Sequence, residues 1–170
     1  WQSEDLGLLM PMEFIPLAEE TGLIVPIGEW VMLEACRQLA QWRSAGLPVE
    51  RVAVNLSARQ MHVGDVAQQI NRILDDSGLP PSCLDIEITE SLAMEQPERT
   101  RALLLSLKQR GITLSMDDFG TGYSSLGYLK QYPLDVLKID RSFVRDIASD
   151  PNDAAIVSTI IAMARSLNLT

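Results

Sequence analysis

Short segments in which apolar and polar residues alternate are followed by longer segments whose apolar residues recur every three or four positions. The first pattern is typical of β-strands and the second of amphipathic helices. The predicted strands span residues 51–56, 83–89, 112–117 and 135–140. The predicted helices span residues 11–20, 26–44, 65–76 and 97–110, and a last one contains Ile156, Ile160 and Ala164. In the helix over 26–44, the stripe from Val31 through Leu39 to Trp42 is predicted to face the core.

Strands that alternate with helices favour an α/β fold whose strands are mainly parallel and joined by right-handed crossovers. An open doubly wound sheet and a (β/α)₈ TIM-type barrel both fit this order. A closed barrel takes about 250 residues. The four predicted strands in 170 residues would therefore form only part of one. The pattern stops at residues 168–170, where another strand would begin, so we interpret the chain as part of a larger domain.

The polar residues of the four predicted strands share one phase. On the face opposite the apolar residues, toward the C-terminal ends of the strands, lie Asn55, Glu87, Asp117 and Lys138. Barrels and open α/β sheets place their chemistry at this end of the strands. An antiparallel sheet with one solvated face would show the same alternation. The long helices between the strands instead favour a sheet that is covered on both faces.

Carboxylates that meet at one rim of a sheet need a compensating cation, because burying a charge without a partner is costly. Carboxylate and amide oxygens suit Mg²⁺ or Mn²⁺ better than zinc or copper. Asp118 adjoins Asp117, and two adjacent acids can serve two cations, the arrangement used for attack on phosphate esters. A structural salt-bridge network around Lys138 is the alternative. Gly120 and Gly122 either let a loop approach a ligand or form an ordinary turn.

Composition limits the partners of the chain. It carries 14 Lys and Arg against 23 Asp and Glu, a net charge of −9, and has no basic run. We therefore expect no general binding of DNA, RNA or anionic lipid, and a phosphate-bearing substrate would need added positive charge, most simply a divalent metal. The one histidine excludes a His-rich zinc site. Two cysteines without a CxxC pattern, and no apolar run of about 18 residues, predict a reduced, cytoplasmic segment without membrane contact.

Five motifs follow one another along nearly the whole chain: EFIPLAEETGLI (13–24), VNLSARQ (54–60), EITES (87–91), DDFGTGYSSL (117–126) and LKIDRSFV (137–144). Together they are highly specific, and they resemble the EAL domains, which are bacterial cyclic di-GMP phosphodiesterases. The resemblance implies a TIM-type barrel with two Mg²⁺ or Mn²⁺ ions at its C-terminal rim. It also implies hydrolysis of one phosphodiester of cyclic di-GMP, which gives linear pGpG, in second-messenger signalling.

The resemblance also implies roles for single residues. The metal ligands would be Asn55, Glu87, Asp117 and Asp118. Lys138 would orient or help deprotonate the attacking water, and Glu90 would brace the loop that follows Asp118. The residues expected at the substrate are Asp140, Gly120, Thr121 and Gly122. In such domains this loop couples dimer contacts to the active site, so a homodimer is an option for this chain.

Two parts of the resembling domains have no counterpart within residues 1–170. The glutamate of the EAL motif would lie shortly before Trp1, and another metal-binding glutamate shortly after Thr170. We therefore expect a single, incomplete EAL-type domain that lacks its first and last strands. A non-catalytic cyclic di-GMP receptor and an inactive fragment of the enzyme stay open as alternatives. Sensor or GGDEF-type domains, and a membrane tether, are expectations for the longer protein.

Overall fold

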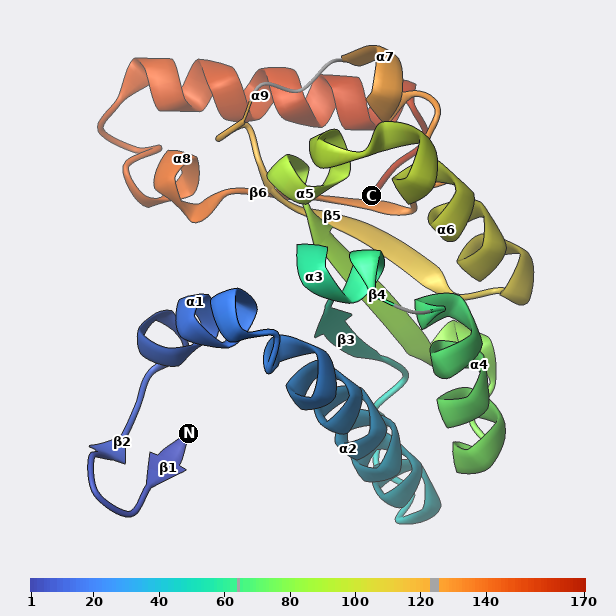
Figure 1. Cartoon of the computed structure of the whole chain (residues 1–170). Helices are drawn as coiled ribbons and strands as arrows, with labels where there is room; N and C mark the ends of the chain where they lie inside the picture. Colours follow the sequence, from blue (N-terminus) through green and yellow to red (C-terminus); the bar gives the residue numbers. More distant parts are fainter. Residues whose placement is uncertain (64, 123–125) are drawn as a thin grey trace.

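The computed structural model describes residues 1–63, 65–122 and 126–170, and its centre is a four-stranded sheet (Figure 1). The strands follow one another across the sheet as β3 (Val52–Asn55), β4 (Leu84–Thr89), β5 (Thr113–Phe119) and β6 (Val136–Ile139). A small antiparallel pair precedes them, β1 (Gln2–Ser3) and β2 (Gly7–Leu8). All neighbours in the main sheet are parallel, which confirms the predicted α/β class and strand direction.

Each strand of the main sheet is followed by a short helix. These short helices are α3 (Ala58–His62), α5 (Glu90–Glu95), α7 (Leu126–Leu129) and α8 (Arg141–Arg145). The long helices are α1 (Pro11–Thr21), α2 (Ile24–Ser44), α4 (Val66–Ser77), α6 (Pro97–Arg110) and α9 (Pro151–Ser166), and a 3₁₀ turn, η1 (Pro81–Cys83), leads into β4. Helices α2, α4, α6 and α9 surround the outside of the curved sheet (Figure 1). The periodicity predicted all the long helices to within a few residues.

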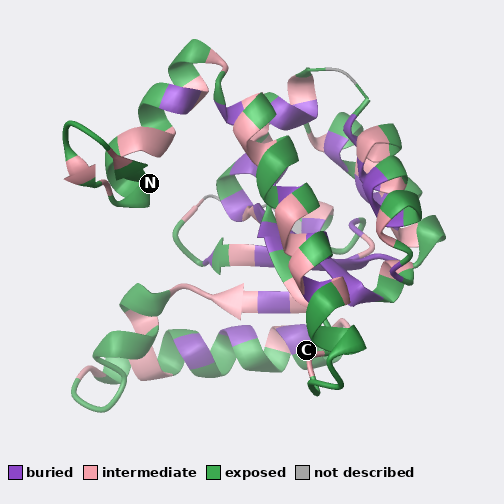
Figure 2. Cartoon of the chain, turned by 90° about the horizontal axis from the view of Figure 1, so that it is seen from below, coloured by how far each residue is buried: buried purple, intermediate pink, exposed green. Residues whose placement is uncertain are grey.

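The core lies between the outer face of the sheet and these long helices. Burial is concentrated in β4 and β5 and on the inner sides of the helices (Figure 2). The fully buried side chains include Ile86, Ile88, Leu114 and Met116 from the strands, and Leu39, Ile70, Leu104 and Leu107 from the helices. Burying one side chain of this size stabilises the fold by about 1.5–3 kcal/mol. The apolar phase of the strands therefore fixes which face receives the helices.

The stripe predicted for α2 is wrong by one position. Met32, Cys36 and Leu39 are buried, whereas Val31 is 40% exposed and Trp42 is 38% exposed. Both stripes contain Leu39 and both have helical spacing, because apolar residues cover more than half of the circumference of this helix. The packing of α2 against β3 and α4 selects one of them.

The last residue of the chain lies beside β6. The Thr170 N–H donates to the carbonyl of Asp135 at 2.9 Å, and the Leu137 N–H donates to the carbonyl of Thr170 at 2.9 Å. This is the alternating pattern by which one parallel strand joins another. It agrees with the expectation that a strand begins at this point.

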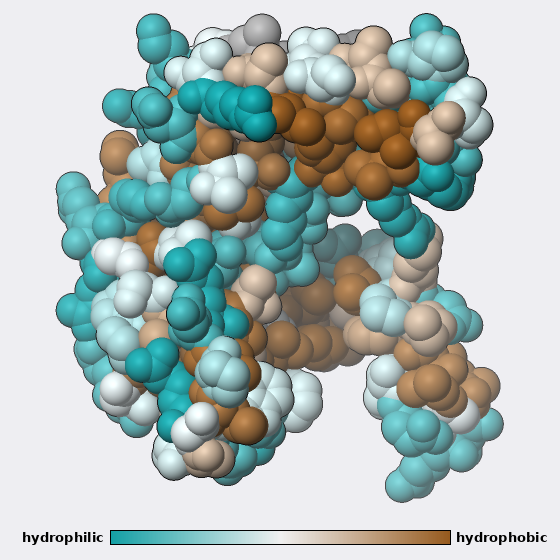
Figure 3. Space-filling model, turned by 180° about the vertical axis from the view of Figure 1, so that it is seen from behind, coloured by the Kyte–Doolittle hydropathy of each residue, from teal (hydrophilic) through white to brown (hydrophobic). Residues whose placement is uncertain are grey.

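Seen from behind, the molecule is hollowed between the layer that holds α8 and α9 and the N-terminal segment, and apolar surface adjoins the hollow (Figure 3). Large apolar side chains are exposed in the N-terminal segment, among them Trp1, Leu6, Leu8, Met10 and Met12. Within the described part of the chain, no helix combines the length and the apolar character needed to cross a membrane.

Candidate active site

The ladder of β3, β4 and β5 places three of the predicted site residues on one face of the sheet. Asn55 is the register partner of Glu87, and Asp117 lies one side-chain level beyond Glu87 on the next strand, opposite Thr89. The Leu56 N–H donates to the carbonyl of Glu87 at 2.9 Å, which continues the ladder past Asn55. Because side chains of equal phase in paired strands share a face, the common polar row predicted from the sequence is present.

Lys138 reaches from β6 across β5 and forms an ion pair with Glu87. Glu87 is only 4% exposed, so its charge depends on such a partner. Ser115, which is level with Glu87 on the intervening strand, is small and leaves room for the lysine chain. Burial lowers the pKa of Lys138, but the hydrogen bond and charge of Glu87, with the charges of Asp117 and Asp85, outweigh it and raise that pKa. Lys138 is therefore an ammonium at neutral pH.

Asp85 is a buried carboxylate beside the candidate site, close enough to act on Lys138, that was not predicted from the sequence. It is buried one level below Glu87 on the same face of β4. The hydroxyl of the fully buried Ser115 donates to its carboxylate, with distances of 2.7 Å and 2.9 Å to the two oxygens. The alternation that pointed to Glu87 also contains Asp85, so the signal was visible. The sequence does not reveal that Ser115 on β5 lies next to Asp85. Its hydrogen bond reduces the free-energy cost of burying this carboxylate.

Asp117 and Asp118 lie on a β-bulge. Pairing runs from Met116 opposite Leu137 to Phe119 opposite Ile139, so three steps along β5 match two along β6. Asp118 takes a left-handed backbone conformation with φ of 55°, and its N–H donates to Oδ1 of Asp117 at 2.9 Å. In a regular strand these adjacent side chains would point to opposite faces, whereas a bulge re-aims them.

Acidic neighbours surround the carboxyl of Asp118. Partial loss of solvent makes the largest contribution to raising its pKa, followed by the negative charges of Asp117 and Asp140, and the positive charge of Arg141 only partly opposes this. A carboxyl whose pKa is raised by folding binds its proton more tightly in the folded state. At neutral pH, ionised Asp118 therefore opposes folding, and this opposition is lost as the pH falls through its raised pKa toward the ordinary value of 3.8.

Asp118→Asn is consequently expected to stabilise the metal-free chain at neutral pH. The side chain is exposed, so the gain is small, about one or two degrees in Tm. The difference should shrink as the pH falls through the raised pKa of Asp118 and become small near pH 3, below the ordinary aspartate pKa of 3.8. Thermal unfolding in a chelator at both pH values tests this, with Asp76→Asn on the exposed side of α4 as the matched control. A lower Tm at pH 7 would contradict the repulsion.

Glu90 anchors the loop that follows β5. Its side chain is 1% exposed, and its Oε2 accepts the N–H of Gly120 at 2.8 Å and the N–H of Gly122 at 3.3 Å. A methyl group added at Gly122 would lie 3.1 Å from the carboxylate. Within the described residues, Oε1 of Glu90 has no hydrogen-bond partner. The brace predicted for Glu90 therefore has a geometric basis, while residues 123–125 of the same motif lie outside the described residues.

Asp140 begins α8 rather than standing free at the rim. Its Oδ1 accepts the N–H of Ser142 at 2.8 Å, and the hydroxyl of Ser142 donates to the same oxygen. The Ser142 side chain, followed by its backbone N–H, lowers the pKa of Asp140. The Asp140 carboxylate also lies close enough to Asp118 to raise the pKa of that residue. Substrate contact by Asp140, Gly120, Thr121 and Gly122 stays a prediction.

The donor set fits hard divalent cations, although it does not form a closed cage. Among the residues that the structure describes, no three Asp, Glu, His or Cys side chains are grouped tightly enough to hold one ion. One oxygen of Glu87, Oε1, accepts a hydrogen bond from the Lys138 ammonium, and Asn55 supplies an amide instead of a charge. Carboxylate and amide oxygens are nevertheless the ligands that Mg²⁺ and Mn²⁺ prefer. The ligand roles of Asn55, Glu87, Asp117 and Asp118 remain predictions.

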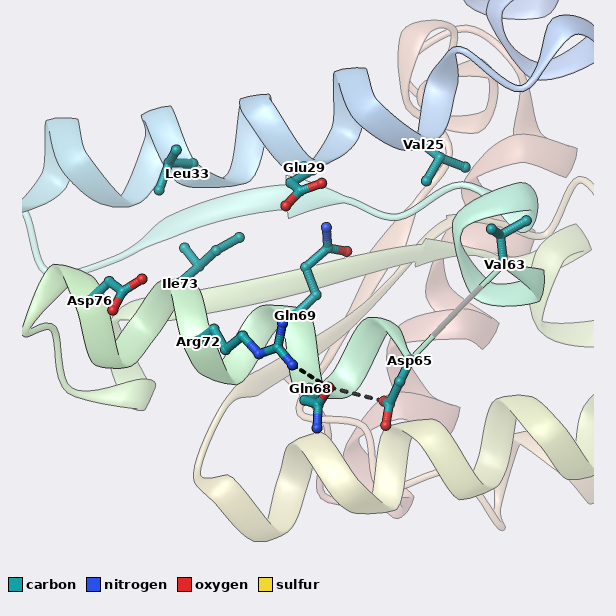
Figure 4. Close-up of a pocket in the computed structure, with 10 residues that line it drawn as sticks. All are labelled: Val25, Glu29, Leu33, Val63, Asp65, Gln68, Gln69, Arg72, Ile73 and Asp76. Carbon is teal, nitrogen blue, oxygen red and sulfur yellow. Dashed lines mark hydrogen bonds between the residues drawn. The ribbon is translucent and has the colours of Figure 1, made fainter.

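A separate groove of about 520 Å³ lies between α2 and α4 (Figure 4). Glu29 and Leu33 line it from α2, and Gln69 and Arg72 line it from α4. None of the predicted site residues reaches it. The chemistry of the strand ends, rather than the size of a cavity, therefore locates the candidate site.

Curated relatives match the chain over nearly its whole length. The bifunctional diguanylate cyclase/cyclic di-GMP phosphodiesterase MucR of Pseudomonas aeruginosa is 51% identical over 170 residues, which are 99% of this chain and 25% of MucR. The cyclic di-GMP phosphodiesterase PdeR of Escherichia coli is 43% identical over 169 residues, again 99% of this chain and 25% of the relative. The chain thus spans about a quarter of the length of these relatives.

Solved structures agree with the sequence matches. The PaMucR phosphodiesterase in complex with c-di-GMP superposes with a TM-score of 0.94 at 48% identity, over 99% of this chain and 68% of that chain. The EAL enzyme Bd1971, bound to cAMP and cyclic di-GMP, gives a TM-score of 0.91 at 33% identity, over 99% of this chain and 47% of that one. These neighbours are TIM barrels, so the four-stranded sheet is part of such a barrel, as the sequence predicted.

The family comparison covers every residue. The EAL domain family matches residues 1–170, and the five motifs, the parallel sheet and the polar row at its C-terminal end are all consistent with that match. The chain therefore belongs to the EAL domain family.

Proposed function

We propose that this chain forms the central part of a metal-dependent phosphodiesterase that hydrolyses one phosphodiester of cyclic di-GMP to linear pGpG. The observation that carries the proposal is the row of Asn55, Glu87 and Asp117 at the C-terminal ends of three adjacent parallel strands. The activities named for MucR and PdeR support the substrate. The c-di-GMP complex of PaMucR supports the proposal that cyclic di-GMP binds to a domain of this shape.

Two divalent cations, Mg²⁺ or Mn²⁺, are part of the proposal. Their ligands would be Asn55, Glu87, Asp117 and Asp118. The crowding of Asp118 by Asp117 and Asp140 supports this choice, because a cation would relieve the repulsion that raises the pKa of Asp118. When bound, such cations supply positive charge for the phosphodiester and lower the pKa of the attacking water.

The chain's own residues have separate tasks in this proposal. Lys138 holds positive charge at the rim, where it can stabilise negative charge that develops on the phosphate. Glu90 holds Gly120 and Gly122 through two N–H contacts, so that residues 120–122 are positioned before substrate arrives. Ser142 and the α8 backbone hold Asp140 beside the acidic pair, which leaves one carboxylate oxygen to orient a water or a substrate group.

A cyclic di-GMP receptor without turnover is the second candidate. The FimX EAL domain from Pseudomonas aeruginosa, bound to c-di-GMP, superposes with a TM-score of 0.84 at 25% identity. In the present structure, Glu87, a predicted metal ligand, is paired with Lys138. A site in which Glu87 keeps this pairing instead of binding a metal would bind cyclic di-GMP without hydrolysing it. Binding and hydrolysis therefore need separate measurements.

The deciding experiment uses the 170-residue chain and a MucR chimera, in which residues 1–170 replace the matching two thirds of the PaMucR phosphodiesterase domain. Each is incubated with Mn²⁺ and cyclic di-GMP, and products are separated by chromatography. We expect the chimera to release pGpG and the chain alone to release none. Saturable binding by the chimera without product would favour the receptor. Product from the chain alone would show that its own residues suffice.

Lys138→Met is expected to lower the hydrolysis rate of the MucR chimera about 100-fold, because one preorganised charge is lost. In the metal-free chain the hydrogen bond and charge of Glu87 raise the pKa of Lys138, and we propose that Lys138 acts by its positive charge and not as the titrating base. The basic limb of the rate–pH profile should then stay in place in the variant. A basic limb that disappears with Lys138 would assign the proton transfer to this residue. Lys130→Met, at an exposed position after α7, is the control.

The setting of the domain in the whole protein is also part of the proposal. The chain covers about a quarter of each curated relative, which supports sensor or GGDEF-type domains alongside it. We propose a cytoplasmic location and a homodimer, with no DNA or RNA partner. The net charge of −9 supports the last point.

A further inference from the structure

The bulge that carries Asp117 and Asp118 needs support from outside β5. Asp118 lies in the left-handed region with φ of 55°, a conformation that few residues other than Gly, Asn and Asp adopt. Its carbonyl accepts the hydroxyl of Thr121 at 2.8 Å and the N–H of Thr121 at 3.4 Å. These two bonds close a turn over Phe119 and Gly120. The position of the Asp118 carboxylate therefore depends on how firmly this turn is held.

Gly120 is held from two sides. On one side its N–H donates to Glu90 at 2.8 Å. On the other side it lies against the ring of Phe143, because a methyl group added at Gly120 would be 2.9 Å from Cε2 of Phe143 and 3.4 Å from Cδ1 of Ile160. Gly120 has φ of 102°, a conformation that other residues rarely adopt. The turn is thus enclosed between a carboxylate on α5 and apolar groups on α8 and α9.

Phe143 comes from the same turn of chain as Asp140. Its N–H donates to the carbonyl of Asp140 at 3.2 Å, and the Asp140 N–H donates to the carbonyl of Phe119 at 3.3 Å. The Asp140 side chain caps α8 through Ser142. The first turn of α8 is therefore tied to the bulge by a backbone bond to Phe119 and by the Phe143 ring against Gly120. Phe119 itself is buried and fixes the bulge to the core.

We infer that Phe143 is a positioning residue: its ring seats Gly120 and so fixes the β5 bulge that aims the Asp118 carboxylate toward the Asp117 side of the sheet. The inference rests on the proposed function for its catalytic consequence, but the seating of the loop does not depend on it. Phe143 touches no reacting group. It acts through the backbone between Asp118 and Gly120. If this turn were not held, the backbone could change its conformation and the Asp118 carboxylate would move with it.

Amide hydrogen exchange of the metal-free chain tests the seating directly. Phe143→Ala removes the ring, and we expect the Gly120 and Thr121 amides to exchange at least about 10-fold faster. Phe143→Leu, which keeps an apolar branch against Gly120, should restore most of the protection. Val144→Ala is the matched control, because Val144 is the next residue of α8 and is 47% exposed. Unchanged exchange in folded Phe143→Ala would overturn the inference.

The consequence for the site is measured in the MucR chimera. For Phe143→Ala we expect Mn²⁺ affinity, followed by calorimetry, and kcat each to fall about 10-fold or more, with KM for cyclic di-GMP changed less than about twofold. Phe143→Leu should recover both. Mn²⁺ affinity and kcat within twofold of the parent, despite faster exchange, would also overturn the positioning role. If the parent chimera hydrolyses nothing, the proposed function fails, and the exchange result alone decides whether Phe143 seats the loop.

Discussion

Glu87→Gln is expected to lower cyclic di-GMP hydrolysis by the MucR chimera about 1,000-fold, the largest effect of any single change. The replacement keeps the shape of the side chain but removes a charged oxygen ligand and the partner of Lys138. Loss of one preorganised electrostatic contact at a reacting centre costs about 100- to 1,000-fold, and a weakened metal site adds to this. The rate of pGpG release at saturating Mn²⁺ measures the effect.

The matched control is Glu95→Gln, an exposed glutamate at the end of the neighbouring helix α5. It makes the same chemical change away from the strand ends and should leave the rate within about twofold of the parent. Circular dichroism and Tm of both variants separate catalysis from folding. If the Glu87→Gln protein retained a tenth of the parent activity, Glu87 would not be an essential metal ligand.

Glu90→Ala is expected to have the second largest effect, on stability and on activity together. It leaves the Gly120 and Gly122 N–H groups without their acceptor and opens a cavity at a side chain that is 1% exposed. Each of these partly buried donors, if left unpaired, costs up to about 1–3 kcal/mol, so Tm should fall by about 5–10 °C for a chain of this size. Hydrolysis should fall with it, because the loop is no longer held near Asp118.

Glu90→Gln separates the two effects. The amide oxygen can still accept both glycine N–H groups, and the amide nitrogen takes the place of the oxygen that has no partner among the described residues. The N–H groups of that amide then lack an acceptor among these residues, which costs about 1–3 kcal/mol, so we expect a smaller fall in Tm than in Glu90→Ala and most of the activity retained. Loss of activity in Glu90→Gln with an unchanged Tm would show that the negative charge of Glu90, and not its brace, is needed.

The regular parts of the fold could be predicted because their signals are local. Helix α6 matches the prediction residue for residue, since Pro97 marks its first position and Gly111, with φ of 92°, ends it. The strands agree within one or two residues because alternation depends only on neighbours along the chain. Strand β5 runs on to Phe119, beyond the predicted end at Asp117, because the bulge lets pairing resume after Asp118.

The short helices and the buried stripe of α2 could not be predicted. Helices α3, α5 and α8 have five or six residues, too few to show a 3.6-residue repeat. For α2, the choice between the stripe with Val31 and the stripe with Met32 depends on how the helix rolls against β3 and α4. That rotation is a tertiary property, and a helix with apolar residues on most sides does not encode it.

The polar row of the site was visible in the sequence, but its contacts were not. The phase of each strand predicts that Asn55, Glu87 and Asp117 share a face. The ion pair of Lys138 with Glu87 and the hydrogen bond of Ser115 to Asp85 depend on the register between distant segments. The bulge at Asp118 likewise depends on the pairing of β5 with β6. Neither register nor bulge has a signature within a single strand.

The small side chain at position 115 links two layers of the barrel interior. Ser115 donates a hydrogen bond to Asp85, one level below it on β4, and, being short, leaves a path for Lys138 to reach Glu87 at its own level. A bulkier residue there would obstruct the path of the Lys138 side chain. An apolar residue would leave the buried Asp85 carboxylate without its hydrogen-bond donor. Evolutionary drift at this position is therefore constrained from two directions, and a descendant that loses the serine should also have replaced the aspartate by an uncharged residue.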